Sequence, residues 1–241
     1  MTGNRDEFHA RPTAALAPWQ DEPSIIGGRD LRSGGGWAGV GVGGAGRMAV
    51  VTNVRDPLAA QAGPSRGALV ADFLRGREPA AVHMDRLAGI AAAYAPFNLL
   101  LADSDSLEYL GNHPAERQTL GPGVHGMSNG ALDAPWPKTR RLMDALSAWL
   151  EADEDLAPLW AALADEHRPA DSELPDTGIG LERERWLSAA FIRGADYGTR
   201  ASTVVAVGHD GCGVIVEQRF GPEGRFLGES RLAFGARAAA G

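Results

Sequence analysis

Four segments of the chain combine charged, amide or hydroxyl side chains with glycine or proline, and these residue types can bind or transform small molecules. An arginine fork beside a carboxylate can hold a neutral amine, and an amide N–H donor can stabilise a developing oxyanion. We therefore expect the four segments to form one polar pocket and not part of the packing core. They are Asn4-Arg5-Asp6-Glu7 with Arg11, residues 33–39 with Trp37, residues 121–129 with His125, Ser128 and Asn129, and residues 197–203 with Tyr197 and Arg200.

The first segment also has a purely structural interpretation. An ion pair between Arg5 and Asp6 would tie the start of the chain to the Arg200 loop, with Trp37 packed beneath. Asn4 and Glu7 are typical of turns and caps, because short polar side chains hydrogen-bond to nearby backbone groups. Both interpretations stay open at this point.

Other motifs point away from common cofactors. The glycines of residues 34–44 lie in or before a predicted hairpin, whereas a dinucleotide loop must follow a strand and open a helix. The six histidines have no metal-binding spacing, so we predict no metal site. His83 is expected to face solvent from a helix, while His125, between two glycines, is the one histidine with a candidate role. The single cysteine, Cys212, excludes an internal disulfide and is expected in a hairpin loop.

Length and charge restrict the class of protein. A chain of 241 residues predicts one soluble domain over residues 1–241. A net charge of −8, with almost no lysine, disfavours nucleic acid as a partner. No apolar run is long enough to span a membrane and the start of the chain is polar, so we expect a cytoplasmic protein.

The elements that must position these residues follow from hydrophobic periodicity and turn signals. Strands alternate in hairpins and helices come in separate blocks, which favours antiparallel sheets over a parallel α/β fold. We expect about eight strands and four or five helices, an α+β class. Predicted strands cover residues 37–42, 48–52, 97–102, 106–110, 203–207, 214–220 and 230–234. Predicted helices start after Ser65, after Pro79, at Pro137 and at residue 156.

Taken together, the four segments resemble the NRDE family, also called the transport and Golgi organization protein 2 family, which is named after the box at residues 4–7. The resemblance runs in order along nearly the whole chain. It implies an N-terminal-nucleophile hydrolase-like fold, a four-layer α-β-β-α sandwich of antiparallel sheets. Supporting matches are Thr52-Asn53, Ser65-Arg66-Gly67, Phe97-Asn98-Leu99 and Pro135-Trp136-Pro137-Lys138.

The resemblance also implies roles for individual residues. In related amidases a terminal cysteine attacks the amide and its own amine acts as the base. By similarity, Arg5 and Asp6 would orient that amine, Asn129 would hold the oxyanion, and Arg200 matches a late arginine. The other pocket candidates for ligand binding are Asn4, Trp37, Asn53, His125, Ser128 and Tyr197.

The chain departs from the family pattern at the nucleophile. Family members begin with Met-Cys and a first strand about twenty residues before the box, whereas here the box follows residue 3. We therefore expect the first strand and the nucleophile to be missing, so that the site is catalytically incomplete. Thr2 is a poor replacement because it aligns with the residue just before the box, and Cys212 has no free α-amine.

Three functions follow as expectations. The first is a small-ligand binding or trafficking protein that handles haem or an acyl lipid. Haem would need an axial ligand, for which His9, His125 and Tyr197 are candidates. The second is an amide hydrolase whose terminal cysteine lies upstream of a misassigned start, and the third is a scaffold without a ligand. We also expect a bacterial source.

Overall fold

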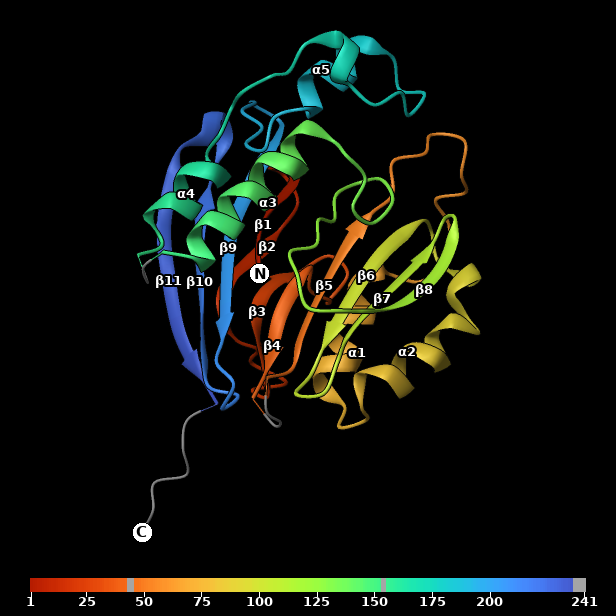
Figure 1. Ribbon diagram of the computed structural model, residues 1–241, viewed down its shortest axis with the longest axis vertical. Coiled ribbons are helices and arrows are strands. Elements are labelled where there is room, and N and C mark those ends of the chain that lie inside the picture. The colour runs from red at the N-terminus through yellow and green to blue at the C-terminus, as the bar shows by residue number, and fades with distance from the viewer. Residues whose placement is uncertain (43–45, 153–154, 236–241) are drawn as a thin grey trace.

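The protein is described by a computed structural model that covers residues 1–42, 46–152 and 155–235. The strands in this part of the chain form two antiparallel sheets, with the orders β2-β3-β4-β5-β6-β7-β8 and β1-β9-β10-β11 (Figure 1). The strands are β1 (Thr2–Phe8), β2 (Thr13–Pro18), β3 (Ile25–Asp30), β4 (Ala38–Gly41), β5 (Met48–Asn53), β6 (Phe97–Ala102), β7 (Leu107–Asn112), β8 (Ala115–Leu120), β9 (Tyr197–Val207), β10 (Gly213–Phe220) and β11 (Phe226–Phe234). The α-helices are α1 (Arg66–Arg75), α2 (Ala80–Ala88), α3 (Pro137–Leu150), α4 (Ala157–Leu163) and α5 (Leu181–Leu187).

The seven-stranded sheet is a meander, and α1 and α2 are inserted between β5 and β6. Helix α1 begins after Ser65, because the Ser65 hydroxyl accepts a hydrogen bond from the Gly67 N–H at 3.3 Å. Its buried side chains Leu69 and Phe73 are four residues apart and face the sheet, where they meet fully buried residues such as Leu99 of β6. The two helices therefore cover one face of this sheet.

The four-stranded sheet joins the two ends of the chain. Strand β1 pairs with β9 from Thr2 opposite Val204 to Phe8 opposite Tyr197, and the register shifts between Arg5 and Asp6. The box at residues 4–7 thus lies on a strand and not in a turn. Because the partner of β1 is β9, the box is placed directly beside residues 197–203.

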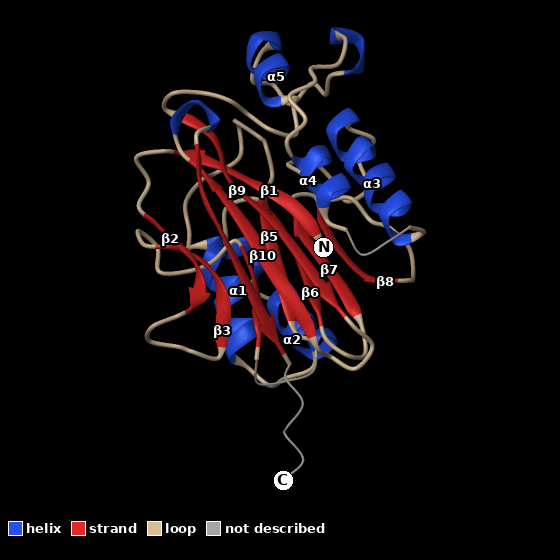
Figure 2. Ribbon diagram, turned by 90° about the vertical axis from the view of Figure 1, so that its left-hand side faces the viewer, coloured by secondary structure: helices blue, strands red, loops and turns tan. Residues whose placement is uncertain are grey.

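The two sheets pack face to face, and helices lie outside both. Apolar side chains from the two sheets meet in one cluster that includes Val40 of β4 and Ile215 of β10. On the outer face of the four-stranded sheet, Leu159 and Leu163 of α4 pack on Val204. Figure 1 shows α3 and α4 beside this sheet, and Figure 2 shows the strands of both sheets running in similar directions. The layers are therefore helix, sheet, sheet and helix.

Several predicted elements are confirmed. The hairpins β4/β5 and β6/β7 and the starts of α1, α2, α3 and α4 lie within a residue or two of their predicted places. The expected turn at residues 43–46 falls mostly outside the described residues. The described residues contain five α-helices, as predicted, but eleven strands, so the predicted number of strands is too low. Four strands were not predicted, namely β1, β2, β3 and β8.

The prediction that His83 faces solvent was wrong. Its side chain is 3% exposed, packs edge-on against the Phe73 ring and lies 3.0 Å from a carboxylate oxygen of Glu78. Val82, the residue before His83 on α2, is 52% exposed. The helix therefore turns its polar imidazole inward because Glu78 supplies a partner for it.

None of the helices in the described ranges is both long and apolar enough to cross a lipid bilayer.

Candidate functional site

The box on β1 sends its side chains to two sides of the strand, because successive side chains of a strand point in opposite directions. Asn4 points toward the helix layer, where its amide N–H groups donate to the carbonyls of Leu163 at 2.8 Å and Ala190 at 2.7 Å. Its carbonyl oxygen accepts from the Ser202 hydroxyl at 2.6 Å. Asn4 therefore fastens β1 to α4 and β9, and its amide is fully used in doing so.

Arg5 points the other way, between the two sheets. Its guanidinium lies 4.4 Å from the centre of the Trp37 ring and 3.5 Å from a carboxylate oxygen of Asp30. A second carboxylate, that of Glu7, lies 3.9 Å away. Burial lowers the pKa of Arg5, which the two carboxylates partly oppose. Trp37 packs against Arg5 as the structural interpretation expected, but across the described residues Arg5 pairs with Asp30 and Glu7 and not with Asp6.

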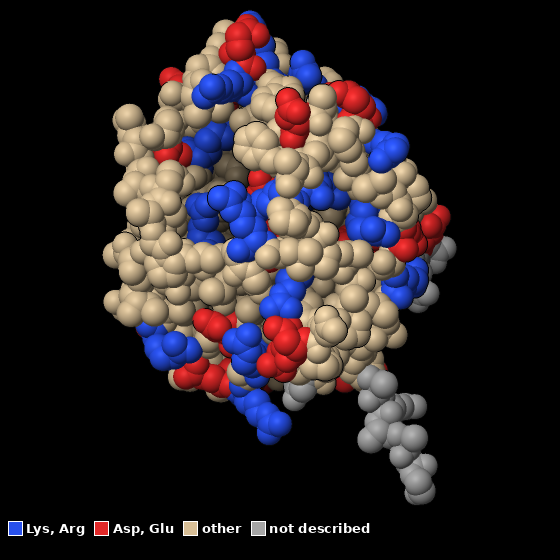
Figure 3. All heavy atoms as spheres, turned by 180° about the vertical axis from the view of Figure 1, so that it is seen from behind, with Lys and Arg blue, Asp and Glu red and all other residues tan. Residues whose placement is uncertain are grey.

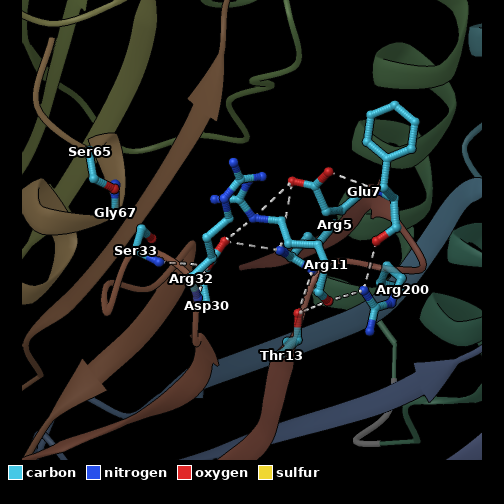
Figure 4. A network of polar contacts seen from close by, with 11 residues as sticks. Arg5, Glu7, Arg11, Thr13, Asp30, Arg32, Ser33, Ser65, Gly67 and Arg200 are labelled. Atoms are coloured by element: carbon cyan, nitrogen blue, oxygen red, sulfur yellow. Dashed lines mark hydrogen bonds and ion pairs between the residues drawn. The ribbon is translucent and has the colours of Figure 1, made fainter.

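Three further arginines surround the same carboxylates. Arg11 donates through Nε to Asp30, and this Nε lies 3.6 Å from Glu7. Arg200 donates through Nη1 to the carbonyls of Phe8 at 2.9 Å and Arg11 at 2.8 Å. Figure 4 shows Arg5, Glu7, Arg11 and Asp30 directed toward one another, with Arg200 next to Arg11 and Thr13.

The fourth arginine, Arg66, reaches this group from the first turn of α1. It donates through Nη1 to the Pro96 carbonyl at 2.9 Å. Burial lowers the pKa of Arg66, the Arg11 cation lowers it further, and Glu7 raises it. The charges of Arg11 and Glu7 thus act on Arg66, although none of its contacts in the described residues joins it to either side chain. We refer to Arg5, Arg11, Arg66, Arg200, Glu7 and Asp30 as the arginine cluster.

The arginine cluster has an excess of positive charge in a chain whose net charge is −8. Four guanidinium groups face two carboxylates, which leaves two positive charges without a partner of opposite sign. Figure 3 shows Lys and Arg side chains gathered around a hollow on the face opposite to that of Figure 1. Arg11, Arg66 and Arg200 are each partly exposed.

A second polar group lies on the helix side of β1. Asp6 accepts a hydrogen bond from the Thr199 hydroxyl at 2.7 Å, and burial raises its pKa. Lys138, at the start of α3, is the only lysine of the chain. Its ammonium donates to the Leu187 carbonyl at 2.9 Å, and burial lowers its pKa to about 8. Asp6 and Lys138 are near enough for each charge to stabilise the other.

Arg55 and Glu184 complete this second group with an ion pair of 2.7 Å. Residue types alone did not single out either side chain, because the pair joins residues 129 positions apart. Lys138 lies in the matching segment Pro135-Trp136-Pro137-Lys138, but the sequence predicted no role for it in the site. A lone lysine directly after Trp136-Pro137 was the one signal that could have drawn attention to it.

The amide candidates join the end of β5 to the following loop. The Asn129 side chain donates to the Asn53 carbonyl at 2.9 Å, and the Ser128 carbonyl accepts from the Thr52 hydroxyl at 2.6 Å. One of the two amide N–H groups of Asn129 is therefore already engaged in the free protein. Its part in an oxyanion hole stays a prediction.

The aromatic candidates differ in their surroundings. Tyr197 stacks edge-on against Phe8 at 5.1 Å, and burial, followed by the charges of Asp6 and Glu7, raises its pKa. His125 contacts Asp133 at 3.0 Å through Nδ1 and the Gly121 carbonyl at 3.1 Å through Nε2. The structure thus brings Tyr197 to the box, whereas the ring nitrogens of His125 bond within their own loop.

The ten predicted residues therefore fall into separate places. Arg5, Trp37 and Arg200 belong to or contact the arginine cluster, and Asp6 and Tyr197 lie by the second polar group. A groove of about 350 Å³ between α3 and residues 167–173 is lined by none of the ten. In chemical terms, the arginine cluster can bind an anion and the second group can hold or release a proton.

Comparison with known proteins agrees with the order of these motifs along the chain. A sequence model of the family described as Transport and Golgi organisation 2 matches residues 1–222. Similar proteins include the Transport and Golgi organization protein 2 homologs of Bos taurus, 31% identical, and Homo sapiens, 30% identical, each aligned over 88% of this chain and 82% of its own length. Transport and Golgi organization protein 2 of Drosophila melanogaster is 27% identical over 86% of this chain and 81% of its own length. The expectation of a bacterial source was wrong on this comparison, because these relatives come from animals. The chain belongs to the Transport and Golgi organisation 2 family.

Proposed function

We propose that this family member binds a small molecule at the arginine cluster beside β1. The single observation that carries the proposal is the arginine cluster, in which Arg5 and Arg11 pair with two carboxylates and the charges of Arg66 and Arg200 act on the same group. Stability alone does not account for such a group, since like charges placed close together oppose folding. Haem and acyl compounds remain the candidate ligands.

We further propose that the scaffold is of the N-terminal-nucleophile hydrolase-like type. The helix, sheet, sheet and helix layers support this proposal. So does the pairing of β1 with β9, which places the box beside Arg200.

Haem as a ligand depends on which candidate can reach the iron. His125 has both ring nitrogens bonded, and the Tyr197 ring lies against Phe8 and Trp186. Burial and the nearby Arg200 cation lower the pKa of His9, which favours the neutral imidazole that binds a metal. Both ring nitrogens of His9 are buried, however, so ligation through His9 requires its side chain to move.

Titration of the purified protein with haem tests this ligand. We expect a saturable change in the Soret band that is lost in His9→Ala and kept in His125→Ala. A Soret change that is equal in wild type and both variants would contradict ligation by His9. Absence of saturation in wild type would remove haem from the candidates.

No contact in the described ranges favours the amide-hydrolase alternative. The Thr2 side chain lies three residues before Arg5 on β1, about 10 Å away along an extended strand. Cys212 follows the far end of β9, more than about 20 Å along the strand from Arg200. We therefore do not propose hydrolysis as the function of the arginine cluster.

A further inference from the structure

We propose that Arg11, Arg66 and Arg200 bind an oxyanion group of the ligand, a carboxylate or a phosphate, and that Glu7 takes the place of this group in the free protein. The inference rests on the proposed function and names the chemical class of its ligand. It follows from four observations: the unused donors of the arginines, their partial burial, the loose hold on Glu7, and the local excess of positive charge.

Each of the three arginines has N–H donors that form no hydrogen bond in the described residues. Arg11 donates a hydrogen bond through Nε only, and Arg66 donates one through Nη1. Arg200 donates two, both through Nη1. Their remaining guanidinium N–H groups have no hydrogen-bond partner among residues 1–42, 46–152 and 155–235. A guanidinium group is a planar fork of several N–H donors, and its shape matches a carboxylate or phosphate bidentately. The three side chains are thus fixed by backbone and carboxylate contacts while donors stay available.

Partial burial makes these charges costly without an anion. Burial is the main cause that lowers the pKa of Arg66 and of Arg200. The Arg11 side chain is 27% exposed. A charge that has lost part of its water gains more from an opposite charge than one in bulk solvent does. An entering oxyanion would therefore stabilise all three guanidinium groups together.

The arginines contact Glu7 at ion-pair distance and form no hydrogen bond with it in the described residues. Its Oε2 lies 3.6 Å from Arg11 Nε and 3.9 Å from Arg5 Nη2, both beyond a normal hydrogen bond. Its Oε1 accepts from the adjacent Phe8 N–H at 2.8 Å, a bond that fixes it to its own strand. A ligand that makes bidentate bonds at normal length would replace this weaker internal anion.

The charge pattern selects small anions. Two uncompensated positive charges lie in a protein whose net charge of −8 as a whole repels other anions. A long polyanion would be repelled by this overall negative charge more strongly than a small molecule with one or two oxyanion groups. The chemistry shared by the candidates is a carboxylate or phosphate at the end of a small molecule.

Calorimetric titration with inorganic pyrophosphate and with citrate tests the inference and separates the two oxyanion types. We expect wild type to bind at least one probe, with affinity that falls as salt is raised because the contacts are ionic. Arg66→Gln should weaken binding about tenfold or more, since it removes a charge-assisted contact. Glu7→Gln should tighten it about three- to tenfold, since it removes the internal competitor.

Arg75→Gln is the matched control. Arg75 lies at the last turn of α1, nine residues and about 14 Å from Arg66, and its partners are Glu22 and Asp72. It carries the same loss of charge as Arg66→Gln and should leave the affinity unchanged. Equal weakening in both variants would overturn the inference, because net charge alone would then explain binding. Should Arg66→Gln fail to fold, the tightening in Glu7→Gln carries the test.

A screen of neutral fragments by amide NMR separates this inference from the proposed function. Failure of both probes, together with neutral fragments that shift the amides of residues 5–11, would overturn the anion inference and leave a binding protein. Failure of the probes and of every fragment would overturn the proposed function as well.

Discussion

The Asn4 side chain offers a sharp test of how the box acts in the fold. It donates to the carbonyls of Leu163 and Ala190 and accepts from the Ser202 hydroxyl, at 2.8, 2.7 and 2.6 Å. Each hydrogen bond contributes about 1 kcal/mol net, and a carbonyl left without a partner costs about 1–3 kcal/mol. Asn4→Ala removes all three bonds and leaves two carbonyls without their hydrogen-bond donor. We therefore expect it to lower the free energy of unfolding by about 3 kcal/mol. For a chain of this size the melting temperature would fall by roughly 6–12 °C.

Guanidinium unfolding followed by tryptophan fluorescence gives this loss directly. Ser202→Ala removes one bond and should cost about 1 kcal/mol. Thr2→Val is the control on the same strand, because the Thr2 hydroxyl is buried without a hydrogen-bond partner in the described structure, and the change should be within about 0.5 kcal/mol of zero. A loss below about 1 kcal/mol for Asn4→Ala would refute the claim that Asn4 ties β1 to α4.

Three further predictions follow from other parts of the molecule. Burial raises the pKa of Glu217 from 4.5 to about 7, so stability should fall by up to about 3 kcal/mol as pH rises through that window, and Glu217→Gln should remove this dependence in unfolding curves at pH 5 to 8. A Cβ on Gly35 would lie 2.4 Å from the Gly67 carbonyl carbon, so Gly35→Ala should cost more than about 2 kcal/mol in denaturant unfolding, whereas Gly121→Ala, with open space around its Cβ, should cost less than about 1. Lys138, being the only lysine, gives the one side-chain signal after reductive ¹³C-methylation, beside that of the N-terminal amine, and its NMR titration should centre near pH 8; a midpoint near 10.5 would contradict its burial.

Local sequence patterns predicted the regular elements well. The apolar run of β6 and the spacing of Leu69 and Phe73 in α1 specify a strand and a helix through side chains that contact the core. Strand β1 was not predicted as a strand, because its sequence Thr2–Phe8 is almost entirely polar. It is extended because β9 supplies its backbone partners, and those lie nearly two hundred residues away.

The sequence predicted which residue types form the candidate site better than it predicted which of these residues contact one another. The segments around Arg5 and Arg200 do meet, as the order of the motifs indicated. The partner of Arg5 is Asp30, however, and no spacing rule connects residues that lie on strands of different sheets. Asn4 shows the same limit, since its turn-like character gave no sign that it would bond to carbonyls beyond residue 160.

The central claim, that the arginine cluster binds a small anion, is tested most directly by the arginine Nε–H signals in NMR. On titration with inorganic pyrophosphate or citrate, we predict saturable shifts for Arg11, Arg66 and Arg200 with one common dissociation constant, while Arg75 stays in place. Shifts that are absent, or that are equal in size and linear in probe for all four arginines, would contradict the account.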